Sequence, residues 1–184
     1  MNQAAHDDTK LLASLALALV EKPRASLQEL ARAAGISKAT LYRFCRTRDE
    51  LIDRLLQHAT ALLHAASDAV DLESGPVRQV LPRLIAAQLE HRELMAFMIY
   101  YWKPGVVEDA PWAHLWATFL ARTDAFFLRG QREGVFRIDI SAATLTEAFG
   151  GLFCGLVEAE VRGRVARASL APVLESLFMN GAST

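Results

Sequence analysis

The amino-acid sequence predicts an all-α protein with about nine helices. Of its 184 residues, 52% are apolar and 22% are charged, which is enough apolar material for a sizeable buried core. Glycine (10) and proline (6) are sparse and fall between the apolar runs. No apolar/polar alternation is long enough to indicate a sheet, so helices with short connections account for the pattern.

Apolar positions with helical spacing place the elements in order. The expected helices span residues 9–21, 27–34, 38–45, 48–70, 77–91, 93–103, 111–133, 141–163 and 169–180. Breaks fall at Lys22-Pro23, Gly35, Gly75-Pro76, Lys103-Pro104-Gly105, Gly134 and residues 163–168.

The most apolar stretch, LLASLALALV at residues 11–20, is interpreted as a buried helix. It is shorter than the roughly 20 residues that span a bilayer. Asp7, Asp8 and Lys10 precede it with a net negative charge, whereas a signal peptide carries positive charge there. We therefore expect a soluble, cytoplasmic protein without a membrane partner.

Charge and aromatic residues divide the chain into two parts. The formal net charge is -1, yet residues 24–48 hold six basic residues and one acidic residue. Of the 15 aromatic residues, only Tyr42 and Phe44 precede Phe97. We expect two domains, a small basic one at residues 1–50 and a larger, aromatic-rich one at residues 51–184.

The basic part contains the pattern of a helix-turn-helix, in which two short helices cross around a tight turn. Ala31 supplies a small residue where the helices touch, and Gly35 supplies the turn. Ser26 with Glu29 predicts a capping box, and Ser37 predicts the N-cap of the second helix. The expected shared core consists of Leu30, Ala34, Ile36, Leu41 and Phe44.

The second short helix turns a polar face away from this core. That face consists of Lys38, Ala39, Thr40, Tyr42 and Arg43. Side chains of this kind reach phosphates and base edges in the major groove. An ordinary helical hairpin with a solvated basic face is the alternative, but the caps, core spacing and charge together favour DNA binding.

The stretch LQELARAAGISKATLYRFCRTRDELIDRLL resembles the DNA-binding region of the TetR family of bacterial transcriptional regulators. Its matching residues are Leu41-Tyr42-Arg43-Phe44-Cys45 and Arg48-Asp49-Glu50-Leu51, with Cys45 and Arg48 where the family usually has Phe and Lys. A later fragment, residues 131–139, resembles the turn that precedes the family's last two helices.

The resemblance implies operator DNA as a partner and assigns roles to single residues. Ser26, Ser37, Thr40 and Arg48 would contact phosphates, Tyr42 a phosphate or base, and Lys38, Ala39 and Arg43 the bases. It also implies that residues 1–50 form a helix-turn-helix DNA-binding domain and residues 51–184 a ligand-binding and dimerisation domain. The whole protein would be a homodimeric repressor that a small, mostly apolar effector releases from DNA, and it would need no cofactor.

Aromatic and methionine residues in the second part form the expected effector site. They recur with helical spacing, and the candidates are Met95, Met98, Trp102, Trp112, Trp116, Phe119, Thr123, Phe149 and Phe153. Bundle interiors are a favoured place for ligand cavities. Plain core packing explains the same spacing equally well.

A stripe of small residues predicts a close helix contact. Ala148, Gly151, Gly155 and Ala159 share one face of the helix expected at 141–163. The contact is either packing within one chain or, as the resemblance implies, a dimer interface that includes Leu170, Leu174 and Leu177.

Two other classes of function are alternatives to a transcriptional regulator. An enzyme is disfavoured because no GxSxG, P-loop, dinucleotide or HExxH motif occurs, and no metal-ligand spacing joins Cys45 or Cys154 to other ligands. A helical ligand-binding protein that has lost DNA binding is disfavoured by the basic face at residues 38–43.

Overall fold

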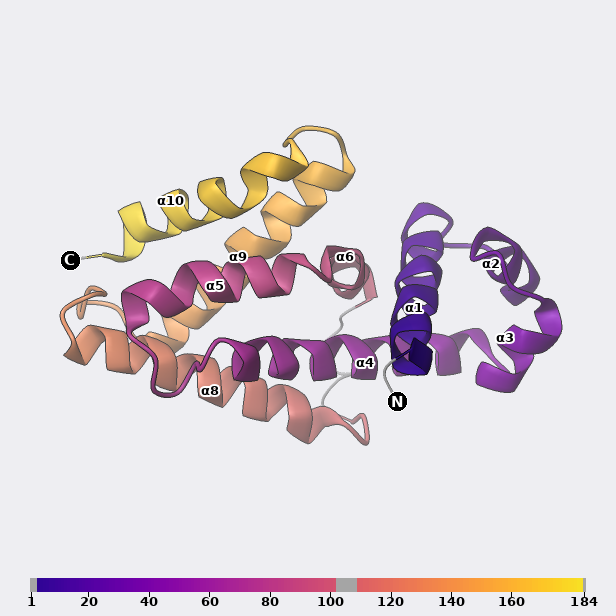
Figure 1. Cartoon of the computed structure of the whole chain (residues 1–184), viewed down its shortest axis with the longest axis horizontal. Coiled ribbons are helices and arrows are strands. Elements are labelled where there is room, and N and C mark those ends of the chain that lie inside the picture. Colours follow the sequence, from indigo (N-terminus) through magenta and orange to yellow (C-terminus); the bar gives the residue numbers. More distant parts are fainter. Residues whose placement is uncertain (1–2, 102–108, 184) are drawn as a thin grey trace. The chain divides into compact units, whose positions relative to one another are not determined.

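A computed structural model describes residues 3–101 and 109–183, with side chains from Thr9 onward. Its α-helices are α1 (Gln3–Glu21), α2 (Leu27–Ala33), α3 (Lys38–Phe44), α4 (Arg48–Ala69), α5 (Val77–Leu89), α6 (Arg92–Tyr101), α8 (Ala113–Arg132), α9 (Ala142–Val161) and α10 (Leu170–Ala182) (Figure 1). A short 3₁₀ helix, Arg167–Ser169, precedes α10. Over these residues the only β pairing is one isolated bridge between Phe136 and Ser183, so the all-α prediction is confirmed.

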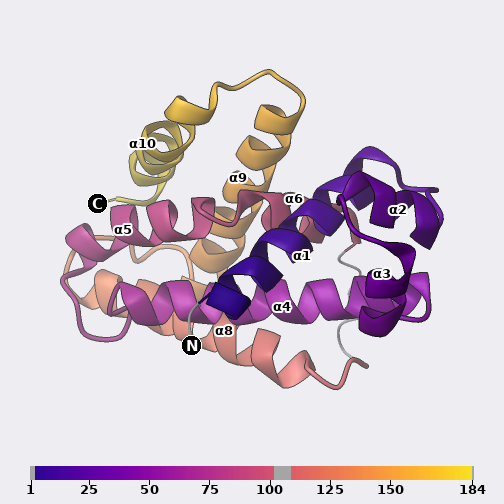
Figure 2. The same cartoon turned by 45° about the vertical axis from the view of Figure 1, so that its right-hand side comes forward.

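The first compact unit contains the helix-turn-helix. It consists of the described residues up to Ala59 together with those between His91 and Ala110. Helix α1 packs against α2 and α6, and α2 packs against α3 (Figure 2). Fully buried Leu15, Leu30, Leu41 and Phe97 form its core. The apolar segment at residues 11–20 is therefore core, as its sequence indicates.

The compact units do not follow the expected division at residue 50. Helix α6, which lies far along the chain, joins the first unit because its apolar residues Leu94 and Phe97 are buried there and the helix packs on α1. Helix α4 begins in the first unit and continues into the second. The functional division into a DNA-binding part and an effector part remains a proposal.

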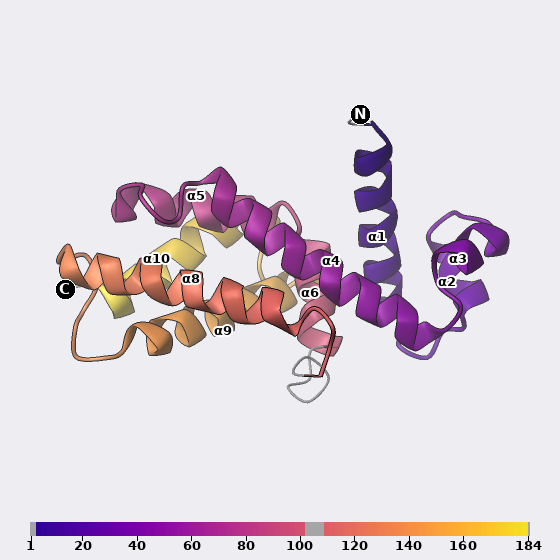
Figure 3. The ribbon, with the colours of Figure 1, turned by 90° about the horizontal axis from the view of Figure 1, so that it is seen from below.

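The second compact unit is a bundle of the C-terminal end of α4 with α5, α8, α9 and α10 (Figure 3). Helix α8 packs on α9, while α10 packs on both α9 and α5. A phenylalanine cluster fills the centre, with ring centroids 5.2 to 6.3 Å apart; it consists of Phe126, Phe127, Phe136, Phe149 and Phe178.

Candidate DNA-binding surface and effector domain

Local hydrogen bonds fix both ends of the expected helix-turn-helix. Ser26 Oγ accepts a hydrogen bond from Glu29 N at 3.3 Å, and Glu29 Oε2 accepts one from Ser26 N at 2.7 Å, which completes the capping box. The hydrogen bonds that Ser26 N and Ser26 Oγ donate to the Glu29 carboxylate hold the pKa of Glu29 below its usual value. Ser37 Oγ accepts from Thr40 N at 3.0 Å and caps α3. The turn between the helices needs φ +69° at Gly35, a conformation that glycine adopts without strain.

The expected shared core of the motif is buried in part, because Ala34 and Ile36 are half-buried. Leu30, Ala31 and Leu41 are at most 1% exposed, and Phe44 is half-buried. Cys45 is also buried, so it fills a core position at the end of α3. Burial raises the pKa of its thiol, which keeps it protonated.

The opposite face of α3 is accessible. Lys38, Ala39, Tyr42 and Arg43 are exposed, whereas Thr40 is half-buried and its hydroxyl pairs with that of Ser37 at 2.8 Å. The Lys38 ammonium lies 5.3 Å from the centre of the Tyr42 ring. A seven-residue helix therefore presents two cations and a phenol side by side, which suits contacts with phosphates and base edges.

Arg48 lies differently from the expectation that it contacts phosphate. Its Nη2 donates hydrogen bonds to Pro23 O at 2.6 Å and to Tyr101 Oη at 2.8 Å. The side chain is half-buried, and its Nε is buried without a hydrogen-bond partner. The structure thus turns Arg48 towards its own chain, because a loop carbonyl and a phenol lie within reach of its guanidinium.

The expected effector residues are divided between the two units. Met95 and Met98 lie in α6 of the first unit, whereas Trp112, Phe119 and Thr123 are buried in the second. Trp116 is half-buried, with its ring centroid 5.4 Å from that of Phe119. Trp102 lies outside the described residues.

Phe149 and Phe153 belong to the packed interior. The ring centroid of Phe149 lies 6.0 Å from that of Phe127 and 5.3 Å from that of Phe178, and Phe153 follows at 6.3 Å from Phe149. The core interpretation of the aromatic spacing therefore applies to these two residues.

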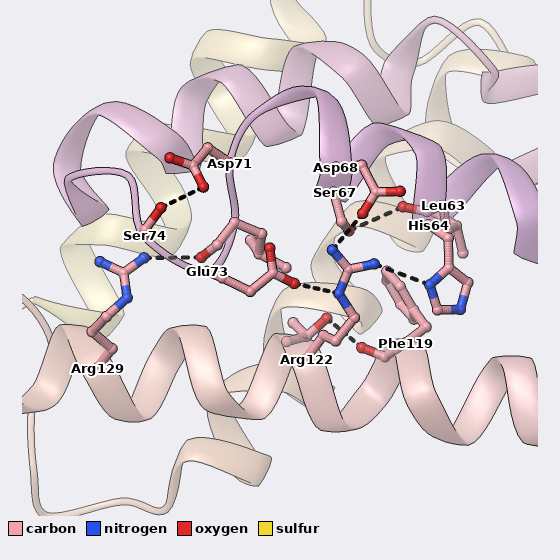
Figure 4. A network of polar contacts seen from close by, with 12 residues as sticks. Leu63, His64, Ser67, Asp68, Asp71, Glu73, Ser74, Phe119, Arg122 and Arg129 are labelled. Carbon is pink, nitrogen blue, oxygen red and sulfur yellow. Dashed lines mark hydrogen bonds and ion pairs between the residues drawn. The ribbon is translucent and has the colours of Figure 1, made fainter.

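Sequence reasoning missed a polar network around Arg122 of α8 (Figure 4). Arg122 donates hydrogen bonds to Asp68 Oδ1 at 2.7 Å, to Glu73 Oε1 and to His64 Nδ1 at 3.1 Å. Because His64 Nδ1 accepts, its Nε2 carries the proton and donates to Leu115 O at 2.7 Å. This network ties the C-terminal end of α4 to α8.

Arg129, two turns further along α8, also joins α8 to the segment that follows α4. It donates to Leu72 O at 2.9 Å and Gly75 O at 2.8 Å, so it satisfies carbonyls of the turn after α4. The seven-residue spacing of Arg122 and Arg129 places both on one helix face, but no sequence signal identifies their partners.

A groove of about 710 Å³ opens beside these arginines. Ala117, Ala121 and Ala125 of α8 form much of its wall, with Leu72 and Arg132 among the other lining residues. None of the expected effector residues lines it.

The small-residue stripe on α9 faces outwards. Ala148, Gly151 and Gly155 are exposed and Ala159 is half-buried. A Cβ built on Gly151 or Gly155 meets no atom within 4 Å, so close packing within one chain does not explain these glycines.

The leucines expected at the same interface have different positions. Leu170 and Leu174 are 2% and 1% exposed and belong to the core, because α10 turns them towards the bundle. Leu177 is 53% exposed and remains available to a partner.

The described part of the chain has neither a cluster of potential metal ligands nor a helix that could span a membrane. No cluster of three or more His, Cys, Asp or Glu side chains within residues 9–101 and 109–183 could hold a metal ion. Over the same part of the chain, no helix has the length and apolar character needed to cross a membrane.

Known proteins resemble the chain along its whole length. It is 47% identical over 183 residues to the HTH-type transcriptional regulator NfxB of Pseudomonas aeruginosa, covering all of this chain and 97% of that protein. It is 32% identical over 99 residues to the HTH-type transcriptional repressor LfrR of Mycolicibacterium smegmatis, about half of each chain. No family model matches.

A solved structure shares the fold. The TetR-like transcriptional regulator LfrR in complex with proflavine superposes with a TM-score of 0.71 at 26% identity, covering 98% of this chain and 99% of that one.

Proposed function

Because the chain belongs to the TetR family of helix-turn-helix transcriptional regulators, we propose that it is a homodimeric repressor that a small effector releases from operator DNA. The observation that carries this proposal is the exposed face of α3. Lys38, Tyr42 and Arg43 project from a helix whose other side is anchored in the core by Leu41. Such a regulator acts where its operator lies, in the bacterial cytoplasm, and works by binding rather than by catalysis.

A homodimer is supported by the outward face of α9. Two-fold dimers use the same patch on both subunits, and a helix whose outer residues are glycine and alanine lets its copy approach closely. Gly151, Gly155 and Ala148 provide that patch, with Leu177 of α10 as apolar area beside it. Ala159 lies on the same stripe. A dimer presents two recognition helices, which need to lie about 34 Å apart to enter successive major grooves.

The effector is proposed to be small and mostly apolar. The aromatic residues at the N-terminal end of α8 are Trp112 and Phe119, which are buried, and Trp116, which is half-buried. The solved LfrR holds proflavine, a flat aromatic molecule, and we propose that this chain accepts molecules of similar chemistry. Thr123, which is buried on the same helix, belongs to the proposed set in this unit.

The direct test is binding of the full chain to the promoter DNA next to its own gene, followed by fluorescence anisotropy. Arg43→Ala should weaken operator binding by about 1–3 kcal/mol if Arg43 contacts a base. Arg132→Ala is the matched control, since it removes an exposed arginine of α8 far along the chain from α3.

Three results would count against the proposal or part of it. If the wild type does not distinguish promoter DNA from unrelated DNA, the proposal that it regulates transcription from this promoter is wrong. Unchanged operator affinity in Arg43→Ala would mean that α3 does not read bases through this residue. Equal losses in Arg43→Ala and Arg132→Ala would indicate general charge attraction only.

A further inference from the structure

One polar node in the first unit joins three parts of the chain that lie far apart in the sequence, namely residues 19–23, Arg48 and Tyr101. Arg48 begins α4, and Tyr101 ends α6. Arg48 Nη2 donates to Tyr101 Oη at 2.8 Å and to Pro23 O at 2.6 Å. Tyr101 Oη in turn donates to Leu19 O, in the last turn of α1, at 3.2 Å.

Pro23 explains why the end of α1 needs this tyrosine. The carbonyl of Leu19 would normally accept a hydrogen bond from the residue four positions later, but that residue is Pro23, which has no N–H. The preceding bond, from Lys22 N to Ala18 O at 3.0 Å, is present. The Tyr101 hydroxyl therefore supplies the donor that the backbone lacks at position 23.

The node is rigid because its members also pack. The Tyr101 ring is stacked on that of fully buried Phe97, with centroids 4.8 Å apart. The Arg48 guanidinium carbon lies 5.5 Å from the Tyr101 ring centre. Both hydrogens of Nη2 are used within the chain, so the direction of the guanidinium is set by Pro23 and Tyr101.

We propose that Arg48 and Tyr101 form a latch by which the end of α6 holds the helix-turn-helix in its DNA-binding arrangement. Arg48 follows α3 after only three residues, and α2 begins four residues after Pro23. The latch thus holds both flanks of the motif, and α6 leads along the chain towards the aromatic residues of α8. In this role Arg48 is a positioning residue and not a phosphate contact. The inference rests on the proposed function, since it assigns a means of control to the same DNA-binding surface.

Loss of the latch should lower the population of the binding-competent arrangement. Apparent affinity falls in proportion to that population. Tyr101→Phe removes only the hydroxyl and with it two hydrogen bonds, to Arg48 and to Leu19 O, each of which corresponds to a change of about 3- to 10-fold. Arg48→Ala should also weaken operator binding, and the loss in the double variant should be smaller than the two single losses combined, because both changes break the Arg48–Tyr101 hydrogen bond.

Salt dependence separates a latch from a phosphate contact. Each phosphate contact contributes about -0.9 to the slope of log K against log salt. We expect wild-type slopes for Tyr101→Phe, Arg48→Ala and the double variant. Tyr100→Phe is the matched control. Tyr100 is the residue next to Tyr101, it is 47% exposed, and its own hydroxyl makes no hydrogen bond in the described structure. It should bind as the wild type does.

A measurement without DNA keeps failure of the latch distinct from failure of the proposed function. Hydrogen exchange of the full-length protein should quicken in peptides covering residues 19–48 for Tyr101→Phe and not for Tyr100→Phe. The latch is overturned if exchange is unchanged in Tyr101→Phe, if that variant binds operator normally, or if Arg48→Ala flattens the salt slope by about 0.9. If exchange quickens in Tyr101→Phe but the wild type binds no promoter, the latch stands and the proposed repressor function fails.

Discussion

At the scale of single residues, the helix-turn-helix is held by hydrogen bonds that span very different distances along the chain. The capping residues Ser26, Glu29 and Ser37 interact with groups three positions away, so their roles follow from local spacing. Arg48 is the opposite case. Its partner Tyr101 lies 53 positions away, and nothing in the sequence indicates that the two side chains are in contact.

The capping box predicts a specific pH dependence. Hydrogen bonds from Ser26 lower the pKa of Glu29 in the folded state below its ordinary value of 4.5. Stability gained from this carboxylate is therefore fully present above the unfolded-state pKa and is lost as the pH falls through the folded one. The free energy of unfolding should thus fall more steeply below pH 5 for the wild type than for Glu29→Gln, in urea titrations at several pH values.

Glu21→Gln serves as the control, because it removes an exposed carboxylate that accepts no hydrogen bond in the described structure. Its pH profile should follow that of the wild type. Parallel profiles for the wild type and Glu29→Gln would contradict the capping argument.

At the scale of elements, the helix pattern was predicted well and the packing partners were not. Each expected helix is present in the described residues, and the helix ends differ from the expected ones by at most two positions, with two exceptions. Helix α1 begins six positions earlier than expected, and residues 102–103 of the helix expected at 93–103 lie outside the described residues. The ends follow from glycine, proline and capping signals. Which helices pack together depends on contacts between distant residues, so the position of α6 on α1 and the attachment of α4 to α8 by Arg122 came only from the structure.

Two glycines on neighbouring helices should respond oppositely to the same substitution. An added Cβ on Gly130 of α8 would lie within 3.0 Å of two ring carbons of Phe136, which is fully buried and cannot move aside freely. Overpacking of this kind costs about 1–3 kcal/mol. Gly150 of α9 has no atom within 4 Å of an added Cβ, so alanine there gains about 1 kcal/mol of helix propensity.

Urea unfolding should therefore show Gly130→Ala as less stable than the wild type and Gly150→Ala as equally or more stable. A stabilised Gly130→Ala would mean that Phe136 can withdraw and that the phenylalanine cluster is loosely packed.

At the scale of the whole molecule, the proposed function depends on a second copy of the chain. The sequence left two explanations for the α9 stripe, and the open surroundings of Gly151 and Gly155 favour the dimer. Gly155→Leu should place a large side chain between the paired helices and yield monomers in light scattering. Ala121→Leu adds similar bulk on the exposed face of α8 and should stay dimeric. An intact dimer in Gly155→Leu would move the interface to another surface.

Regulation also requires that effector binding and operator binding weaken each other. An effector changes DNA affinity only if it binds the released conformation better than the DNA-bound one. Linkage then requires operator DNA to weaken effector binding by the same factor, commonly about 5- to 150-fold. Proflavine is the probe, and its fluorescence anisotropy is followed with the wild-type protein in the presence of operator and in the presence of an equal amount of unrelated duplex, because the dye itself binds between base pairs. Trp116→Ala should weaken proflavine binding while operator affinity stays unchanged, because Trp116 lies on α8 and not on α3. Leu128→Ala removes an exposed apolar side chain of the same helix and should bind proflavine normally. Equal proflavine affinity with operator and with unrelated duplex would establish a binding site that is not coupled to DNA release.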